Sequence, residues 1–249
     1  MHVKSFQNPL LLGFFLHGLQ PCLAQIVPPE RCATGVHAIL IRGQGPGDHL
    51  NVMVSVQNLI LQLIPGSSSV DLPYKHGVDD HRIAAADGAS LMQEYIRYYA
   101  ASCPNSKIFV HGYSLGGVVM MDGLCGTSSQ WLFPVSALEP RYNRTVIAAV
   151  SYGEETFVPG VPYSVGTCTD GTGTSGWYFR LVSGIYPRIH PEWCDAYAAS
   201  LRSYCDEDDA TCCFRIPPPD NLAHFLYIFR YNMDVLHFVQ QRLNATRSQ

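Results

Sequence analysis

The sequence predicts an α/β fold in which a central parallel sheet is covered by helices on both faces. Short apolar runs that are typical of buried strands alternate with longer segments whose apolar residues recur at helical spacing. The strand-like runs are almost continuously apolar, as expected for strands buried on both faces. The 249 residues show no internal repeat and no linker, and 47% of them are hydrophobic, so we expect one domain with a sizeable core.

The amino-terminal half contains two predicted strands and two predicted helices. Residues 36–42 are apolar and rich in β-branched side chains, which predicts a buried strand that ends in a glycine-rich loop. Residues 49–64 carry apolar side chains at roughly helical spacing and predict a helix. A short strand over 70–73 and a long helix over 84–101 follow.

The alternation continues in the remaining part of the chain. Residues 107–112 predict a second buried strand and 115–125 predict the helix after it. A third such strand is expected over 145–151, and the last helix over roughly 223–243. The Gly/Thr/Ser-rich stretch 169–176 predicts a loop inside the same domain.

The first 24 residues have the layout of a secretory signal peptide. Lys4 supplies the positive start, an apolar stretch follows, and small residues lie three and one places before Gln25. That stretch is too short to cross a bilayer, and no later segment reaches about 18 uninterrupted apolar residues. We therefore expect a secreted protein without stable membrane insertion, with a single domain over 25–249.

Charge composition excludes one large class of partners. The chain has 16 Lys and Arg against 20 Asp and Glu, a formal net charge of −4, and no dense basic run. Neutralisation of a phosphate backbone needs clustered basic side chains, so we expect no nucleic-acid partner. We also expect a monomer that needs no cofactor.

Cysteines and glycosylation sequons both indicate an exported protein. Removal of the first 24 residues leaves eight cysteines, and an even number in an exported chain predicts four disulfides. A zinc site is the alternative, but no CxxC pair is present and two of the cysteines are adjacent, so we expect no metal. Eight cysteines allow 105 pairings, which leaves the connectivity open. Sequons lie at Asn143 and Asn244. The eight cysteines are Cys32, Cys103, Cys125, Cys168, Cys194, Cys205, Cys212 and Cys213.

A nucleophile motif lies between a predicted strand and a predicted helix. Residues 112–116 read Gly-Tyr-Ser-Leu-Gly and match G-x-S-x-G. In that context the motif forms a sharp turn that presents the serine at the carboxyl edge of the sheet. We therefore predict Ser114 as a nucleophile, with the backbone N–H of Leu115 as an oxyanion donor at the start of the helix.

A serine nucleophile needs a base, and three histidines follow it in the sequence. In sheets of this kind the order along the chain is serine, acid, histidine. His190 precedes the acidic cluster, and His237 lies deep in the last predicted helix. His224 follows a proline-rich loop and is expected to open the last helix, so we choose it as the base.

Candidates for the orienting acid lie in the stretch from Cys205 to Cys212, which reads Cys-Asp-Glu-Asp-Asp-Ala-Thr-Cys. A bridge between these two cysteines would close a small rigid loop around one carboxylate. Reasoning from the residues alone leaves Asp206, Asp208 and Asp209 open.

These motifs together resemble carbohydrate esterase family 5, the secreted fungal cutinase and acetylxylan esterase family, with more similarity to the acetylxylan esterase branch. The resembling blocks frame nearly the whole mature chain, and the block around the acidic loop is the most specific. The blocks are Cys32 with 36–43, Cys103 with 107–117, and 203–213 followed by His224.

The resemblance implies an α/β-hydrolase-type, cutinase-like three-layer sandwich without a large lid. It places the catalytic acid four residues after the first cysteine of the acidic loop, which is Asp209 here, and the catalytic histidine at His224. It also suggests four bridges, namely Cys32–Cys103, Cys125–Cys168, Cys194–Cys213 and Cys205–Cys212.

The chain departs from the family pattern at two places near the predicted serine. Leu115 follows Ser114 where the family usually has Gln, and Gln44 stands where Ser or Thr usually gives the second oxyanion donor. The backbone N–H or the side-chain amide of Gln44 would then serve. The stretch 169–193 also looks longer than usual, and its aromatic residues would either shape a substrate cleft or belong to the core. These are Trp177, Tyr178, Tyr186 and Trp193.

The leading functional hypothesis is a secreted serine esterase that removes acetyl groups from a plant cell-wall polysaccharide such as xylan. A Ser-His-Asp triad and an acyl-enzyme intermediate would carry the reaction. A cutinase or short-chain lipid esterase is the first alternative. A non-catalytic cell-wall-binding protein on an esterase scaffold is the second, and the departures at Leu115 and Gln44 motivate it.

Overall fold

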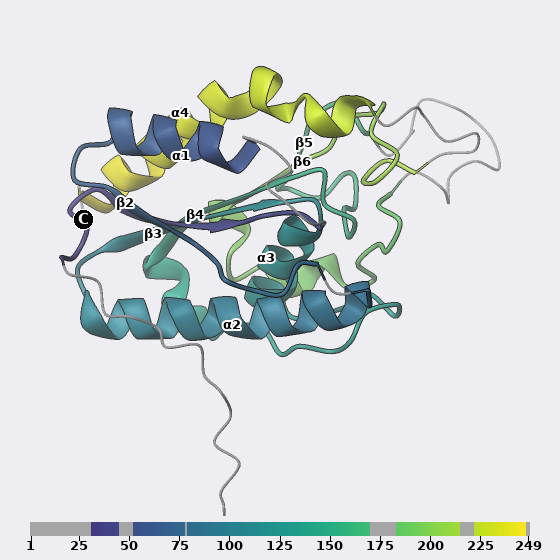
Figure 1. Ribbon diagram of the computed structural model, residues 1–249, viewed down its shortest axis with the longest axis horizontal. Coiled ribbons are helices and arrows are strands. Elements are labelled where there is room, and N and C mark those ends of the chain that lie inside the picture. Colours follow the sequence, from purple (N-terminus) through teal and green to yellow (C-terminus); the bar gives the residue numbers. More distant parts are fainter. Residues whose placement is uncertain (1–30, 45–51, 78, 170–182, 215–221, 248–249) are drawn as a thin grey trace, which may run out of the picture.

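A six-stranded sheet forms the centre of the protein, with strand order β2-β1-β3-β4-β6-β5 and parallel pairing throughout. The computed structural model describes residues 31–44, 52–77, 79–169, 183–214 and 222–247 (Figure 1). The strands are β1 (Val36–Ile41), β2 (Ser68–Asp71), β3 (Lys107–Tyr113), β4 (Val146–Tyr152), β5 (Ser164–Val165) and β6 (Leu201–Tyr204).

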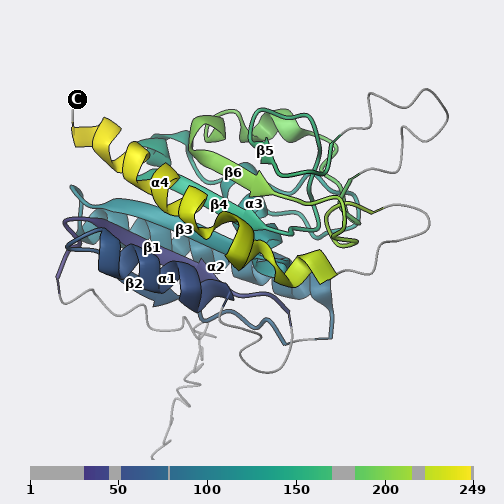
Figure 2. The same cartoon turned by 90° about the horizontal axis from the view of Figure 1, so that it is seen from above.

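Helices cover both faces of the sheet, which gives three layers. In Figure 1, α1 and α4 lie above the sheet, and α2 and α3 lie below it. Figure 2 shows α4 running across the sheet on the same side as α1. The helices are α1 (Val52–Leu63), α2 (His81–Ser102), α3 (Leu115–Cys125) and α4 (Tyr227–Arg247), and the 3-10 segments are η1 (Pro140–Arg144), η2 (Pro191–Cys194), η3 (Ala198–Ser200) and η4 (Leu222–Phe225).

The strands β1, β3 and β4 are largely apolar and buried on both sides because each face supplies one half of the core. Along β1, Ile39 and Ile41 join the core beneath α2 and α3, whereas Ala38 and Leu40 join the core beneath α1 and α4. Successive side chains of a strand point to opposite faces. A continuous apolar run is therefore the pattern of a doubly covered strand, and the predicted α/β sandwich is confirmed.

Element ends differ from the predictions where polar side chains define them. The long helix begins at His81 rather than near residue 84 because the Asp80 carboxylate caps it, accepting from Arg82 N at 3.0 Å. The last helix begins at Tyr227, so His224 lies in η4 and does not open α4. The strands β5 and β6 were not predicted, because two to four residues are too few to show a periodic pattern.

Two of the implied disulfides are present. Cys32 is bonded to Cys103, which ties the segment before β1 to the end of α2. Cys205 is bonded to Cys212, which closes the acidic loop after β6. The first bridge anchors the start of the described chain, and the second restrains the candidate acids.

The other two implied disulfides are wrong. Cys125, at the end of α3, lies against η2 and is bonded to Cys194 rather than to Cys168, with the two Cα atoms 4.6 Å apart. Cys213 is bonded to Cys168, not to Cys194. The backbone explains the second pairing, because Cys168 N donates to Cys205 O at 3.0 Å and so places the segment after β5 beside the acidic loop.

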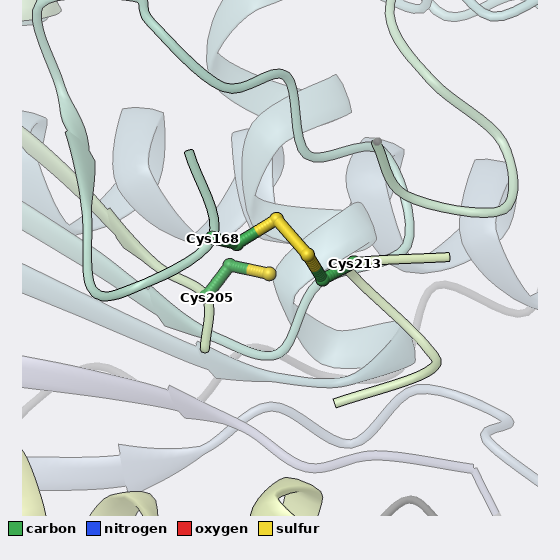
Figure 3. Close-up of side chains that lie close together, drawn as sticks. All are labelled: Cys168, Cys205 and Cys213. Atoms are coloured by element: carbon green, nitrogen blue, oxygen red, sulfur yellow. A yellow bond between two sulfur atoms is a disulfide. The ribbon is translucent and has the colours of Figure 1, made fainter. Parts of the chain in front are cut away.

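Two bridges meet at the acidic loop. Figure 3 shows the Cys168–Cys213 bond with the sulfur of Cys205 beside it, and the three sulfur atoms lie within 4.8 Å of one another. Such spacing resembles a metal site, but each of these sulfurs is already in a disulfide. Cysteine binds metals as a thiolate, and a sulfur in a disulfide is not a thiolate. The cluster therefore serves to crosslink the acidic loop to the segment after β5.

Several predictions fall outside the described part of the chain. The predicted signal peptide lies there, as do Trp177 and Tyr178. Among the helices that the structure describes, none combines the length and the apolar character that a bilayer crossing requires.

Candidate active site

Ser114 lies in a strained turn between β3 and α3. Its φ is 54° and its ψ is −124°, and it is the one non-glycine residue with positive φ in the described part of the chain. Such a conformation costs of order 1–3 kcal/mol and persists where the surrounding structure imposes it. The turn has the strand-to-helix geometry that the motif predicts for a nucleophile elbow. The side chain makes no capping hydrogen bond to α3 and is half-buried.

Close packing at the start of α3 imposes this turn. A Cβ at Gly116 would lie 2.0 Å from Ile41 O, so a larger residue cannot occupy this position without backbone movement. A Cβ at Gly43 would lie 3.1 Å from the Cβ of Ser114. The end of β1 and the loop after it therefore lie directly against the elbow.

The amino end of α3 provides an unpaired backbone donor. Gly117 N and Val118 N both donate to Ser114 O, at 2.8 and 3.2 Å. Leu115 N is one of the first amides of the helix, which have no acceptor within it, and no described group accepts from it. The Leu115 side chain is fully buried in the core beneath α2 and α3, so only its backbone faces the elbow region.

Asp209 and His224 form a buried hydrogen-bonded pair. His224 Nδ1 lies 2.9 Å from Asp209 Oδ2, with Asp209 fully buried and His224 7% exposed. Asp209 Oδ1 also accepts from Thr211 N at 2.9 Å. A carboxylate bonded to Nδ1 leaves Nε2 as the nitrogen available for proton transfer.

The structure resolves which acid contacts the histidine. The Asp206 carboxylate instead accepts from Arg230 at 2.5 Å and from Tyr231 Oη at 2.6 Å. Asp208 is partly exposed and, among the described residues, contacts Arg230 at 3.3 Å. Burial acts to raise the pKa of Asp206, but hydrogen bonds from Tyr231 and Arg230 outweigh burial and hold that pKa below its usual range.

The other two candidate histidines lie elsewhere. His190 is exposed on the segment before η2, where Nδ1 lies 2.9 Å from Glu192 Oε1 and the ring stacks on Trp193. His237 is exposed on α4. Neither residue contacts Asp209.

Two tyrosines that the sequence analysis did not select hold the Asp–His pair. Tyr227 Oη donates to Asp209 Oδ2 at 2.8 Å, and Tyr113 Oη donates to the backbone oxygen of His224 at 3.0 Å. Burial, and then the charge of Asp209, raises the pKa of both phenols, which keeps them neutral donors. The sequence positions of both tyrosines could have drawn attention to them, since Tyr113 directly precedes Ser114 and Tyr227 follows His224 by three residues.

The serine and the histidine approach the same stretch of β4 from two directions. Ser114 N donates to Tyr152 O at 2.9 Å. The next residue, Gly153, has φ +57°, and a Cβ there would lie 2.8 Å from His224 Nδ1 and 2.6 Å from Asp209 Oδ2. Among the described residues Ser114 Oγ has no hydrogen bond; catalytic hydrogen bonds are often long before substrate binds.

A second histidine contacts the predicted oxyanion residue. His81 Nδ1 lies 2.9 Å from Gln44 Oε1, and His81 Nε2 lies 2.5 Å from Glu155 Oε2. Gln44 follows β1, His81 begins α2, and Glu155 follows β4. No sequence motif pointed to His81 or Glu155.

Residues with other predicted roles are found on the surface. The sequon residues Asn143, in η1, and Asn244, in α4, are exposed. Trp193 is 49% exposed, whereas Tyr186 is partly buried and packs against the core.

Comparison with known proteins gives the family. Residues 32–243 match the family model described as Cutinase. The chain is 26% identical to an acetylxylan esterase of Hypocrea jecorina, over 99% of this chain and 80% of that protein. It is also 26% identical to cutinase 11 of Verticillium dahliae, over 89% of this chain and 73% of that protein.

Solved structures agree with the fold. The catalytic core domain of acetyl xylan esterase from Trichoderma reesei superimposes with a TM-score of 0.71 at 23% identity, covering 85% of this chain and 100% of that one. A cutinase-like protein from Cryptococcus sp. gives a TM-score of 0.60 at 17% identity, over 86% of this chain and 98% of that one. The chain belongs to the cutinase family of carboxylic ester hydrolases.

Proposed function

We propose that this protein is a secreted serine esterase that removes acetyl groups from plant cell-wall polysaccharide such as xylan. The observation that carries the proposal is the buried 2.9 Å contact between His224 Nδ1 and Asp209 Oδ2 beside the Ser114 elbow. Four disulfides fit an extracellular protein, in agreement with the predicted signal peptide. We expect a monomer that carries glycans at Asn143 and Asn244.

Acylation begins when Ser114 Oγ attacks the ester carbonyl. His224 Nε2 takes the serine proton, and Asp209 stabilises the resulting imidazolium through Nδ1. The tetrahedral oxyanion accepts a hydrogen bond from Leu115 N and a second from Gln44. Collapse of the intermediate breaks the bond to the sugar oxygen, which leaves with the proton from His224 and departs as the free hydroxyl.

Deacylation repeats these steps with water as the nucleophile. His224 takes a proton from water as it attacks the acetyl carbonyl, and the second tetrahedral intermediate releases acetate and the Ser114 hydroxyl. The two departures from the family pattern affect only the oxyanion donors. A backbone N–H does not depend on the side chain at position 115, and Gln44 has both a backbone and a side-chain donor.

A cutinase or short-chain lipid esterase is the second candidate. The match to cutinase 11 at the same 26% identity as the acetylxylan esterase favours keeping it. The two candidates differ in the acyl chain that the site accepts.

Ser114→Ala and a series of acyl esters test the proposal together. We expect Ser114→Ala to lower kcat by about 10⁶-fold while the fold is retained, because the nucleophile is lost. In the wild type, kcat/KM on p-nitrophenyl esters should fall steeply from acetate to butyrate and longer chains. A profile that rises with chain length would favour the cutinase reading instead.

A serine-directed phosphonate separates an enzyme from a non-catalytic scaffold. The wild type should become labelled at Ser114, and Ser114→Ala should not. A wild type that neither reacts with the phosphonate nor hydrolyses p-nitrophenyl acetate would overturn the esterase proposal for this chain.

A further inference from the structure

A histidine–carboxylate pair outside the proposed triad lies beside the predicted oxyanion residue. His81 Nε2 lies 2.5 Å from Glu155 Oε2, and His81 Nδ1 lies 2.9 Å from Gln44 Oε1. The Glu155 side chain is 6% exposed and the His81 side chain 18% exposed. The contact between His81 and Glu155 is therefore largely shielded from water, where electrostatic interactions are stronger, whereas the contact between His81 and Gln44 is exposed.

The pair joins three segments at the carboxyl edge of the sheet. Gln44 belongs to the loop after β1, and its neighbour Gly43 lies against the Cβ of Ser114. His81 is the first residue of α2, and Glu155 follows β4. The contacts of His81 therefore connect the loop beside the nucleophile to a fixed part of the fold.

Glu155 is itself held firmly. Its backbone oxygen accepts from Tyr186 N at 2.9 Å. Its charge acts together with burial to raise the pKa of Tyr74, whose hydroxyl donates to Arg42 O at 2.5 Å. The carboxylate is thus anchored by its own backbone, and Tyr74 restrains the same loop two residues before Gln44.

The contact between His81 and Gln44 determines which end of the Gln44 amide faces the ring. His81 Nδ1 lies at hydrogen-bond distance from Gln44 Oε1, 2.9 Å, whereas the contact of Nε2 with Glu155 Oε2 is close but lacks hydrogen-bond geometry. An amide oxygen only accepts, so Nδ1 is the donor in this pair. A ring that donates from Nδ1 selects Oε1 of Gln44 and leaves the amide N–H groups free. No described residue accepts from Nε2 of Gln44.

We propose that His81, held by Glu155, is a positioning residue that orients the Gln44 amide so that its N–H groups serve the oxyanion that forms at Ser114. The inference rests on the proposed esterase function and deepens it. Without His81, the amide of Gln44 is free to rotate and to present its oxygen, which would repel the developing negative charge. The expected effect is on kcat rather than on KM, because the oxyanion forms only in the transition state.

A double-mutant cycle in kcat for p-nitrophenyl acetate tests this positioning role. We expect Gln44→Ala to lower kcat by about 100-fold, because it deletes the amide donor to the oxyanion. His81→Ala should lower kcat by about 10-fold, because the amide is still present and only its orientation is lost. The variant that combines both changes should have the same kcat as Gln44→Ala alone, because His81 acts only through Gln44. KM should change less than kcat in each variant.

Two further variants keep the test informative if His81→Ala folds poorly. His81→Asn keeps an N–H donor close to the position of Nδ1 and should recover most of the lost kcat. Glu155→Gln removes the charge with little change in shape; it should lower kcat in the wild-type background and leave kcat unchanged in the Gln44→Ala background. His190→Ala is the matched control, because it removes an exposed histidine paired with Glu192 at 2.9 Å and should not change kcat.

Separate outcomes overturn the two proposals. If Ser114→Ala is inactive but His81→Ala has the kcat of the wild type, the positioning role is wrong and the esterase proposal stands. Losses in the combined variant that multiply, or a Gln44→Ala variant with full kcat, also overturn the positioning role. Turnover that survives in Ser114→Ala overturns the proposed function and this inference with it.

Discussion

Three aspartates follow Cys205, and their neighbours give each a different task. Asp209 is fully buried and contacts His224, whereas Asp206 accepts from Tyr231 and Arg230. Asp206 O also accepts from Asp209 N at 3.0 Å, so Asp206 supports the loop that carries the candidate catalytic acid. Hydrogen-bond partners, and not position in the acidic run, therefore separate a catalytic candidate from a structural one.

The lowered pKa of Asp206 predicts a pH-dependent contribution to stability. A carboxyl group with a lower pKa in the folded than in the unfolded state stabilises the fold above its unfolded pKa, about 3.9, and loses that contribution as the pH falls through the folded pKa. Tyr231→Phe removes the 2.6 Å donor, so we expect it to lower the free energy of unfolding at neutral pH and to have a smaller effect in acid. Urea unfolding at several pH values measures this.

Tyr95→Phe is the matched control for that experiment. The Tyr95 hydroxyl has no hydrogen bond within the described residues, so its loss should have the same small effect at every pH. A destabilisation by Tyr231→Phe that is equally large in acid would contradict the role assigned to the Asp206 charge.

At the level of elements, the junction of β1, β3 and α3 creates the site. The turn at Ser114 depends on the approach of α3 to the end of β1, where Gly116 meets Ile41 O. The same approach brings Gly43 against Ser114 and leaves Leu115 N unpaired at the start of α3. Local sequence predicts the strand and the helix, and their contact with a third element imposes the strained geometry.

Gly116→Ala should disrupt this junction. Its Cβ would lie 2.0 Å from a backbone oxygen, so the backbone must shift, and we expect a loss of roughly 3 kcal/mol or more in the free energy of unfolding. Gly77→Ala is the control, because a Cβ there meets nothing within 4 Å, and we expect a change within about 0.5 kcal/mol. Urea unfolding with the disulfides intact compares the two; equal stabilities would show that the junction tolerates the extra carbon.

Across the whole molecule, disulfides connect segments that the sheet alone does not hold together. The Cys125–Cys194 bridge ties the end of α3 to η2, and the Cys168–Cys213 bridge ties the segment after β5 to the acidic loop. The Cys205–Cys212 bridge meets the latter beside Asp209. The candidate acid is therefore restrained covalently on both sides of its loop.

The observed pairing has a measurable consequence. Digestion without reduction should yield a peptide pair linked through Cys125 and Cys194, and none linked through Cys125 and Cys168. Replacing both Cys125 and Cys194 by serine opens a loop with a sequence separation of 69 residues, which corresponds to about 4 kcal/mol of stability in the chain-entropy model. Mass spectrometry and urea unfolding measure these two effects; a Cys125–Cys168 peptide pair would refute the connectivity.

The sequence by itself determined the layered α/β fold and a sharp turn at Ser114, and it singled out His224 as the candidate base, because apolar periodicity and the G-x-S-x-G turn are local properties of the chain. A family resemblance was needed to select Asp209, since three aspartates within four positions look alike in a linear pattern. The two wrong disulfides show the same limit, because bonding requires two Cα atoms to come within about 7 Å and spacing along the chain does not measure that distance.

Only the tertiary structure decided the contacts between residues far apart in sequence. The pair formed by His81 and Glu155 spans 74 positions by its residue numbers, 155 − 81, and neither residue lies in a recognisable motif. The position of Tyr227, three residues after His224, is visible in the sequence, but its contact with Asp209 is a result of the tertiary structure. Packing of the segments after β1, β4 and β6 at one edge of the sheet brings these side chains together, because parallel strands place all of their carboxyl ends on the same side.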